Sequence, residues 1–281
     1  MEFRGKNVII EDGCKIGKNV VLEDDVYVDS NCIIRDNVTI KKGTTVGANC
    51  IIGEYTADWF EKHDAVLRPV VIGENSIIRS GSIIYSDNII GDNFQTGHQV
   101  TIREKSIIGN NVSVGTLSDI QGNCKIGSYV RLHSNVHVGQ LSKIDSFTWI
   151  FPYVVLTNDP TPPSNNFVGV HVKSFAVVAT GAVIMPGIII GQDSLIGAGA
   201  IVTKNVEDYA VVVGNPGKQI SDVRNIKSHI TDENIYPWRN HFESYMPWMG
   251  MGFDKWYSGL NEDEKIQLGI NSIKMQGLDN N

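Results

Sequence analysis

Residues 106–127 read SIIGNNVSVGTLSDIQGNCKIG, and an aliphatic residue returns in them every six positions, at Ile108, Val114, Ile120 and Ile126. Four positions after each aliphatic residue stands a small or β-branched one, such as Val112. An amphipathic helix has a period of about 3.6 residues and a flat strand a period of about 2, so neither fits this spacing. We therefore predict that the chain turns a corner every six residues.

The same period extends over most of the chain in three registers. They cover residues 10–52, 72–156 and 172–202, and only Thr96 is off type within the second register. Three hexads close one coil, and stacked coils form a parallel β-helix in which each coil contacts its neighbours. The predicted fold is an all-β solenoid of about ten coils at ordinary strand spacing.

Glycine often follows the repeating aliphatic residue, as at Gly73, Gly91 and Gly109. Glycine lacks a Cβ atom and adopts a positive φ at little steric cost. We therefore predict that these glycines provide a positive φ at the tight turns.

The four cysteines all stand two residues before a repeating aliphatic residue, at Cys14, Cys32, Cys50 and Cys124. This is the position that small inward side chains occupy in the other hexads. We predict that the cysteines are small core residues in a reduced compartment. The pattern argues against a disulfide framework and against a cysteine metal site.

The repeat is interrupted twice, and we expect both interruptions to leave the solenoid as loops. They span residues 53–71 and 157–171, and the second contains three prolines. Insertions into a regular solenoid often belong to a binding face. The β-helix domain is thus predicted to span residues 1–218 with these two insertions.

The remaining residues, 219–281, depart from the repeat and contain three of the chain's five tryptophans. A segment so rich in large apolar groups is not typical of a disordered end. Asn261 and Glu264 match a helix capping box, and three isoleucines follow on one helical stripe, at Ile266, Ile270 and Ile273. We predict an α-helical extension that caps the solenoid or packs on a neighbouring subunit.

The composition argues against several classes of partner. There are 24 basic and 31 acidic residues, with a formal charge of -7 and no basic cluster, so we do not expect nucleic acid binding. The N-terminus lacks the apolar core of a signal peptide, and no later run approaches the roughly 18 apolar residues of a membrane span. We expect a cytoplasmic protein without membrane insertion.

Several segments carry a family resemblance, roughly over residues 7–218. GDNFQTGHQVTIRE at 91–104, RLHSNVHVG at 131–139, WIFPYVVLTNDPTPPS at 149–164 and VTKNVEDYAVVVGNPGK at 202–218 resemble the left-handed β-helix acyltransferases. The resemblance is closest to bacterial N-acyltransferases of dTDP-linked amino sugars, which serve surface polysaccharide synthesis. It implies a left-handed coil, a homotrimer with active sites between subunits, and acyl-CoA, most simply acetyl-CoA, as the donor without a metal.

The chemistry that the resemblance implies is attack of a sugar amine on a thioester. The enzyme must position the neutral amine, accept a proton and stabilise an oxyanion. We expect His98 or His133 to accept the proton and Glu104 and Asn158 to orient the sugar. Alternatively, the amine arrives neutral and loses its proton to water. One coil is three hexads, so His133 lies above Gly115 and is expected to be open on the outer face.

Two further sets of residues complete the predicted site. The acceptor is expected to contact Asn135, His137, Asp159 and Tyr85, with His137 directly above Asp119 in the next coil. The donor is expected to lie over small corner residues with open backbone amides, with two lysines near its phosphates. These donor residues are Ala179, Thr180, Gly197, Ala198, Lys204, Asn215, Pro216 and Lys218.

Three alternative functions stay open at this point. One is a sugar O-acetyltransferase, which differs only in the atom that attacks. Another is a zinc protein like the β-helical carbonic anhydrases, with His98, His133 and His137 as ligands across a subunit interface. The third is a non-catalytic scaffold. The acyl group, the nucleotide and the choice between a C3 and a C4 amine also stay open.

Overall fold

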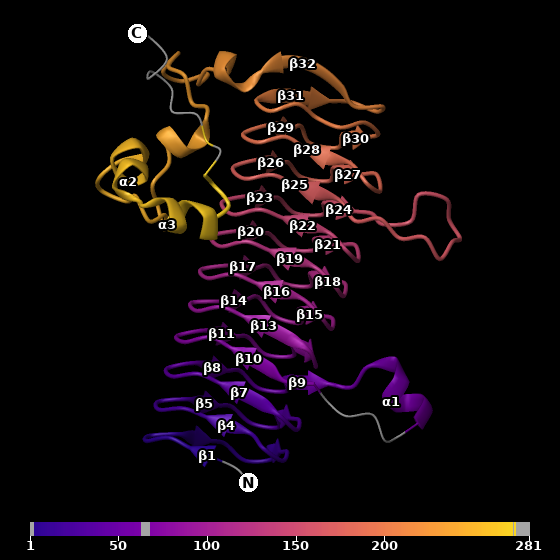
Figure 1. Cartoon of the computed structure of the whole chain (residues 1–281), viewed down its shortest axis with the longest axis vertical. Helices are drawn as coiled ribbons and strands as arrows, with labels where there is room; N and C mark the ends of the chain where they lie inside the picture. Colours follow the sequence, from indigo (N-terminus) through magenta and orange to yellow (C-terminus); the bar gives the residue numbers. More distant parts are fainter. Residues whose placement is uncertain (1–2, 63–67, 272, 274–281) are drawn as a thin grey trace.

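The structure is a computed structural model that describes residues 3–62, 68–271 and 273. Figure 1 shows a tall solenoid whose N-terminal coil lies at one end and whose last coil lies at the other. Three parallel sheets, A, B and C, run along it, and ten described strands in each of sheets A and C match the predicted number of coils. No helix among the described residues has the length and apolar character needed to span a membrane.

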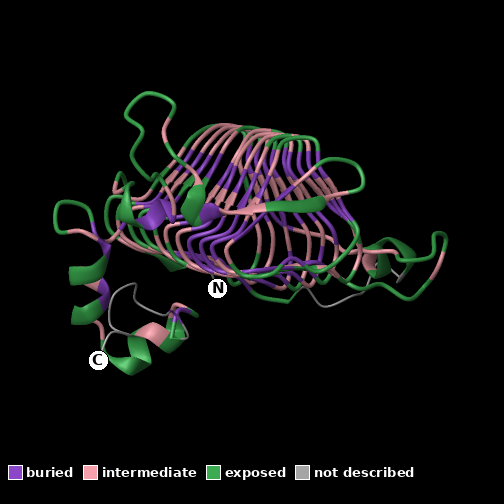
Figure 2. Ribbon diagram, turned by 90° about the horizontal axis from the view of Figure 1, so that it is seen from above, coloured by how far each residue is buried: buried purple, intermediate pink, exposed green. Residues whose placement is uncertain are grey.

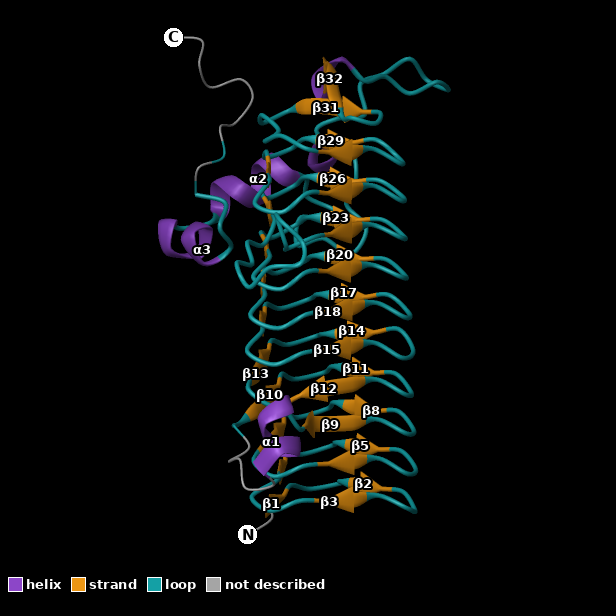
Figure 3. Ribbon diagram, turned by 90° about the vertical axis from the view of Figure 1, so that its right-hand side faces the viewer, coloured by secondary structure: helices purple, strands orange, loops and turns teal. Residues whose placement is uncertain are grey.

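Each coil contributes one short strand to each sheet (Figure 3). Sheet A contains β1 (Phe3–Arg4), β4 (Val21–Leu22), β7 (Val38–Ile40), β10 (Val70–Ile72), β13 (Asn88–Ile90), β16 (Ile107–Ile108), β19 (Lys125–Ile126), β22 (Lys143–Ile144), β25 (His171–Val172) and β28 (Ile189–Ile190). Sheet B contains β2 (Ile9–Ile10), β5 (Tyr27–Val28), β8 (Thr45–Val46), β11 (Ile77–Ile78), β14 (Gln95–Thr96), β17 (Ser113–Val114), β20 (Arg131–Leu132), β23 (Trp149–Ile150), β26 (Val177–Val178), β29 (Leu195–Ile196), β31 (Ala210–Val213) and β32 (Lys218–Asp222). Sheet C contains β3 (Lys15–Ile16), β6 (Ile33–Ile34), β9 (Ile51–Glu54), β12 (Ile83–Tyr85), β15 (Thr101–Ile102), β18 (Asp119–Ile120), β21 (His137–Val138), β24 (Val155–Leu156), β27 (Val183–Ile184) and β30 (Ile201–Val202).

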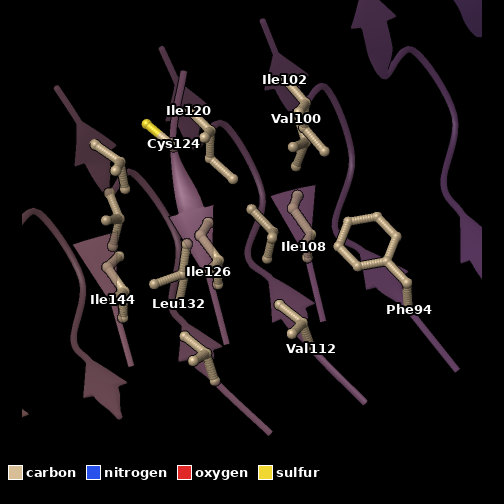
Figure 4. Packing of buried hydrophobic residues seen from close by; sticks show 14 of the residues in the cluster. Phe94, Val100, Ile102, Ile108, Val112, Ile120, Cys124, Ile126, Leu132 and Ile144 are labelled. Carbon is tan, nitrogen blue, oxygen red and sulfur yellow. The ribbon is translucent and has the colours of Figure 1, made fainter. Parts of the chain in front are cut away.

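The repeating aliphatic residues form the core of the solenoid. Within each strand the residue before the repeating one faces outward and the repeating one faces inward, so Ile108 is buried while Ile107 is 51% exposed. Figure 4 shows inward side chains of successive coils packed on one another, and Figure 2 shows the buried residues lining the inside of the stack. The predicted period of six is therefore confirmed: the chain turns a corner after each short strand, most of which have two residues.

The one off-type residue of the long register, Thr96, is buried next to an unusually large neighbour. Phe94 is fully buried at the position that other hexads give to a small residue, and it adds apolar volume to the coil that Thr96 lacks (Figure 4). The Thr96 hydroxyl accepts a hydrogen bond from the backbone N–H of Arg79 at 2.8 Å. A buried hydroxyl is thereby satisfied.

The cysteines lie where the sequence predicts. Cys32, Cys50 and Cys124 are buried, Cys14 is partly buried, and all four are free thiols. Burial raises the pKa of Cys124 to about 12. A thiol with so high a pKa is unreactive near neutral pH, which agrees with a packing role.

The role predicted for the glycines after the aliphatic residues is wrong. The residue with positive φ in a corner stands two positions later and is most often asparagine, as at Asn75 (φ 52°) and Asn111 (φ 57°). Glycine is needed for a different reason, because consecutive coils approach closely. A Cβ atom on Gly73 would lie 2.3 Å from the backbone of Gly91 in the next coil.

Each coil has three corners, which we name by the residues they carry. The aromatic corner, between sheets A and B, carries Tyr129, Phe147, Phe175 and Asp193. The histidine corner, between sheets B and C, carries His98, His133, Ala179 and Gly197. The insertion corner, between sheets C and A, carries Glu104 and both interruptions of the repeat.

The two insertions project from the same corner on one side of the solenoid (Figure 1). The first follows β9 and includes α1 (Ala57–Lys62), whereas the second joins β24 to β25 without a helix or strand. The Asp159 carboxylate accepts hydrogen bonds from the Ser164 hydroxyl at 2.7 Å and from the Ser164 and Thr161 backbone N–H groups. These bonds lower the pKa of Asp159 and hold the second insertion, so this residue acts as a local organiser in the described chain.

Most of the C-terminal extension lies along the side of its own solenoid, whereas its first strand, β32, lies at the end of sheet B (Figure 1). This strand pairs with β31 in antiparallel orientation, so sheet B continues a few residues beyond residue 218. Among the described residues of the extension, four short helices follow: η1 (Val223–Asn225), η2 (Trp238–Asn240), α2 (Phe253–Gly259) and α3 (Glu262–Gln267). The capping box of Asn261 and Glu264 is confirmed, but α3 ends before Ile270 and Ile266 is 59% exposed, so the predicted stripe is wrong.

The extension packs on this side because the aromatic corner offers it an apolar surface. The ring of Phe147 stacks between Tyr129 and Phe175, with centroids 5.0 Å apart in both pairs. Trp238 donates its indole N–H to the backbone carbonyl of Phe175 at 2.8 Å. Arg239 forms a fully buried ion pair with Asp193. The helical part of the extension therefore docks on the chain's own aromatic corner, and the predicted contact with a neighbouring subunit stays a prediction.

Candidate active site

A cavity of about 430 Å³ lies over sheet B where it meets the histidine corner. His98 and His133 line it from the corner, Arg131 and Trp149 line it from β20 and β23, and Arg79 lines it just after β11. Successive coils pair at an offset of three hexads, as between Ser113 and Arg131, so residues far apart in sequence stack on one face. The site is thus built from several coils of one solenoid face.

His133 is held more tightly than the sequence suggests. Its ring stacks on Phe151 of the next coil, with centroids 4.6 Å apart and planes 13° apart. Its Nε2 atom is buried without a hydrogen-bond partner among the described residues. The expectation of an open ring is wrong because the ring packs upward onto Phe151, although Gly115 lies below it. Burial lowers the pKa of His133 below its ordinary value of 6.5, because desolvation disfavours the charged imidazolium.

The other two histidines of interest have different surroundings. His98 is exposed on the same corner, and its backbone N–H donates to the Thr116 hydroxyl at 3.2 Å. His137 lies on sheet C with Nδ1 3.2 Å from the Asp119 carboxylate, as predicted. Burial acts to raise the pKa of Asp119, but hydrogen bonds from His137 and Gln121 outweigh it and lower the pKa.

The structure does not bring Glu104, Asn158 and Tyr85 to the histidines within one chain. Glu104 accepts from Arg103 at 3.0 Å, and the Arg103 guanidinium lies 5.4 Å from the Tyr85 ring centroid. Glu104 lines another cavity, of about 430 Å³, between the insertion corner and the first insertion. Asn158 lies where the second insertion begins. Sheet C separates this corner from the histidine corner, so the predicted catalytic set is divided. Asn135, by contrast, lies on the histidine corner with φ 58°.

The amides predicted to be open at Ala179 and Gly197 are occupied. The N–H of Ala179 donates to Ile196 at 2.9 Å and that of Gly197 donates to Val212 at 2.8 Å. These bonds join consecutive coils, which explains why the first residue of a corner cannot offer its amide to a ligand. The prediction of open amides is therefore wrong for Ala179 and Gly197.

Open backbone groups do exist one position later on the same corner. The N–H groups of Thr180 and Ala198 have no hydrogen-bond partner among the described residues. Gly181 and Gly199 follow them with φ 71° and 68°, and no atom lies within 4 Å of a Cβ built on either. We call these four residues, Thr180, Gly181, Ala198 and Gly199, the donor surface.

The lysines lie around a different cavity near the last coil. Lys204, Pro216 and Lys218 line a space of about 350 Å³, and both lysines are exposed. Asn215 adjoins Pro216 but does not line this space. Lys204 follows β30 at the insertion corner, so a donor contacting both it and the donor surface would have to cross the outer face of sheet C.

Sequence reasoning missed three residues that line the cavity at His133, namely Arg79, Arg131 and Trp149. The coil arithmetic applied to His133 finds Arg79 in the same column three coils earlier, and it places Trp149 next to Arg131 in sheet B. Sequence reasoning also missed a titratable cluster on sheet A. There His171 lies 2.8 Å from Asp145, which pairs with Lys143 at 3.0 Å. Across the described residues, no three His, Cys, Asp or Glu side chains are grouped as they would be around a metal ion.

Comparison with known proteins agrees with this architecture. Residues 7–42 and 105–140 match the family model described as Bacterial transferase hexapeptide (six repeats). The chain therefore contains hexapeptide repeats of the bacterial transferase type in these two segments. Both matched segments lie in the solenoid, where the chain turns a corner after every sixth residue.

Individual relatives match this hexapeptide-repeat chain over part of their length. The Bifunctional protein GlmU of Synechococcus sp. (strain CC9605) is 30% identical over 158 residues, which are 51% of this chain and 34% of that protein. A Chloramphenicol acetyltransferase of Klebsiella aerogenes is 47% identical over 58 residues, which are 21% of this chain and 25% of that protein. The matched segments therefore span about a third or less of these curated relatives. The crystal structure of LpxA, a UDP-N-acetylglucosamine acyltransferase from Bacteroides fragilis 9343, aligns with 98% of this chain and 91% of its own, at 18% identity and a TM-score of 0.47.

Proposed function

We propose that the protein is a CoA-dependent N-acyltransferase that transfers an acyl group, most simply acetyl, to the amine of a dTDP-linked amino sugar. The observation that carries this proposal is the arrangement along the histidine corner. His133, with a lowered pKa, lies between a polar cavity over sheet B and the donor surface of the later coils. A neutral base between an acceptor cavity and an open backbone surface is the arrangement that acyl transfer to an amine needs.

The reaction requires no nucleophile from the protein. The amine nitrogen attacks the thioester carbonyl carbon, a C–N bond forms, and the tetrahedral intermediate loses the CoA thiolate as the C–S bond breaks. His133 accepts the proton that the amine loses and returns it to the departing thiolate, so protons balance. His98, exposed in the same cavity, is the alternative base. The products are the N-acyl sugar and CoA.

The donor surface suits the pantetheine arm of CoA. Its amide groups accept and donate hydrogen bonds, and the unpartnered N–H groups of Thr180 and Ala198 are donors placed one coil apart on the corner. The glycines beside them leave space for an extended chain. Lys204 and Lys218 are the cations available to the phosphates near the last coil.

A homotrimer would bring the divided set of candidate residues together. Sheet C is flanked by the histidine corner on one side and the insertion corner on the other, so three sheets C facing a threefold axis would place unlike corners of neighbouring subunits side by side. The outward residues of sheet C support this, because most are aliphatic and partly exposed: Ile33, Ile51, Ile83, Val155, Val183 and Ile201. Glu104 and Asn158 of one subunit would then face His98 and His133 of the next.

The function is tested by incubating the protein with acetyl-CoA and a panel of nucleotide-linked C3 and C4 amino sugars. Mass spectrometry of the sugar and thiol release from CoA are read together. We expect one dTDP-linked amino sugar to gain an acetyl group that survives mild alkali, as an amide does. An alkali-labile product would indicate O-acetylation instead, and loss of activity after chelation would indicate a metal enzyme. If no product forms and CoA does not bind, the result would favour the non-catalytic scaffold.

The subunit arrangement is tested by mixing two inactive variants, His133→Ala and Glu104→Gln. If each site uses one residue from each of two neighbours, mixed trimers contain sites with both native residues and regain part of the activity. Light scattering should report a trimer for both variants. A fully active monomer, or no recovery in verified mixed trimers, would contradict the shared site.

A further inference from the structure

A polar groove crosses sheet B from the histidine corner to the C-terminal extension. The cavity of about 430 Å³ at His133 adjoins one of about 640 Å³, and the two share Gln95, Ser113 and Arg131. Tyr245 of the extension lines the far end of the larger cavity. We call this continuous surface the sheet B groove.

Two arginines give the groove a positive charge that no carboxylate balances. Arg79 donates through Nη1 to the backbone carbonyl of Thr96, and Arg131 donates through Nη1 to that of Asn111. Within the described part of the chain, neither forms an ion pair. Five other arginines do pair with carboxylates: Arg35, Arg68, Arg103, Arg224 and Arg239. Two unbalanced guanidinium groups in one groove are suited to an anion with several oxygens.

Thr96, the residue that interrupts the hydrophobic repeat, helps to position Arg79. Thr96 accepts from the backbone N–H of Arg79 through its hydroxyl and from the guanidinium through its carbonyl. An aliphatic residue at this position would keep the core but would lose the first of these bonds. Thr96 is therefore a positioning residue, which explains why the long register departs from type in the coil that follows Arg79.

Tyr245 adds an aromatic surface to the far end of the groove. Its side chain is 82% exposed, although the next residue, Met246, is buried in the extension. Its backbone has a φ of 62°. A positive φ is uncommon for tyrosine, and this residue does not belong to a corner of the solenoid. Asn93 and Asn111 line the same cavity and offer amide groups that can pair with the edge of a planar ring.

We propose that the sheet B groove binds the nucleoside diphosphate of the acceptor, with the diphosphate on Arg79 and Arg131 and the base stacked on Tyr245. This inference rests on the proposed function, since it assigns the subsite for the nucleotide part of that acceptor.

The position of the groove favours the acceptor over CoA, which also carries a diphosphate. Arg79 lies three coils before His133 on the histidine corner, whereas Gly197 lies three coils after it. The two ends are thus roughly 14 Å on either side of His133 at ordinary strand spacing. The acceptor phosphates and the acyl donor therefore approach the base from opposite directions.

The subsite is tested by calorimetric titration of the full-length protein with dTDP and with inorganic pyrophosphate, in the absence of acyl donor. We expect Arg79→Gln and Arg131→Gln each to weaken both ligands at least about tenfold, as loss of charge-assisted hydrogen bonds should. Tyr245→Ala should weaken dTDP about fivefold or more and leave pyrophosphate unchanged, because only dTDP has a base to stack. Arg68→Gln, which removes an exposed arginine at the insertion corner, is the matched control and should change neither.

Further measurements separate this inference from its competitors. Thr96→Val retains the volume of the buried residue and should weaken pyrophosphate less than Arg79→Gln does, which covers the case in which an arginine variant misfolds. If the arginine variants lose CoA affinity and keep dTDP affinity, the groove is a donor site and the inference is overturned. If dTDP binds as expected but no amino sugar is acylated, the proposed function fails and the subsite stands. Unchanged pyrophosphate binding in folded arginine variants overturns the subsite even if acylation is observed.

Discussion

The aromatic corner and the histidine corner have the same backbone conformation, but side chains at equivalent positions are buried at the first and exposed at the second. Phe147 and Tyr153 both occupy the left-handed position of their corner, with φ 64° and 62°. Phe147 is fully buried, whereas Tyr153 is 62% exposed. The coil accepts a large ring at either corner, so the difference lies in what covers it. The extension covers the aromatic corner and leaves the histidine corner open.

The two corners also differ in how their polar groups are satisfied. At the aromatic corner, Asp193 pairs with Arg239 in a fully buried contact. At the histidine corner, Nε2 of His133 and the N–H groups of Thr180 and Ala198 have no partner among the described residues. Among the described residues, a buried nitrogen lacks a partner at both corners, Nε of Arg239 and Nε2 of His133. The difference is therefore that the Thr180 and Ala198 N–H groups lie on an exposed surface that a ligand can reach.

The largest effect is expected from removing a ring at the covered corner. Phe147→Ala should lower the free energy of unfolding by about 3–5 kcal/mol, because it leaves a cavity among packed aromatic rings. Tyr153→Ala, at the same backbone position on the open corner, should change it by less than about 0.5 kcal/mol. Urea unfolding followed by tryptophan fluorescence and circular dichroism measures both. An equal decrease in the free energy of unfolding for both variants would show that contacts within the coils, and not the C-terminal extension, stabilise these rings.

The next effect concerns the base at the open corner. His133→Ala should lower turnover at least tenfold and up to about 10²–10⁴-fold with little change in folding, if His133 is the general base. His137→Ala, on sheet C, should do less, and His98→Ala tests the alternative base. Steady-state kinetics with acetyl-CoA and the amino sugar measure all three.

The pH dependence of the wild-type enzyme follows from the lowered pKa of His133. A base acts only when neutral, so kcat/KM should stay level as pH falls past 6.5 and should decline only as pH passes through the lowered pKa. Full turnover of the histidine variants from about pH 6 to 9 would mean that the amine needs no base from the enzyme.

A smaller effect is expected at the donor surface. Gly199→Asn preserves the tolerance for positive φ but fills the open space, so the KM for acetyl-CoA should rise roughly threefold to tenfold, as for one or two lost hydrogen bonds. Gly81→Asn changes the same corner position in an earlier coil, where φ is 75°, and should leave that KM unchanged. A donor KM equally affected by both variants would remove the donor surface from the site.

The smallest effect is expected on sheet C. The pKa of Asp119 is lowered in the folded chain, so its pairing adds stability above the unfolded pKa near 3.9 and loses it as pH falls through the lowered value. Both partners are more than a third exposed, so His137→Asn should cost less than about 1 kcal/mol at pH 6. Urea unfolding at pH 6 and pH 3 should show the difference shrinking at the lower pH. A constant difference would assign the effect to packing.

The fold could be predicted in detail because the decisive interactions are local and periodic. Each inward residue from Ile108 to Ile126 occupies the same place in its hexad, and an offset of three hexads then places His137 above Asp119 without further information. The residues missed at the site, Arg79 and Arg131, follow the same arithmetic, but they are ordinary surface arginines until the absence of a carboxylate partner is known. Charge balance is a property of neighbours in space and is not visible in one hexad.

By itself, the sequence determined the solenoid, its coil length, its two insertions and the stacking of side chains into columns, because every coil is defined by contacts within itself and with the next coil. Only the tertiary structure decided that the extension docks on the aromatic corner, that the ring of His133 packs on Phe151, and that Glu104 lies across sheet C from the histidines. Those outcomes depend on which outward face of the solenoid a distant segment covers. The residues that face outward do not contribute to the six-residue period. The repeat therefore predicts the coils but not which outer face the C-terminal extension packs on.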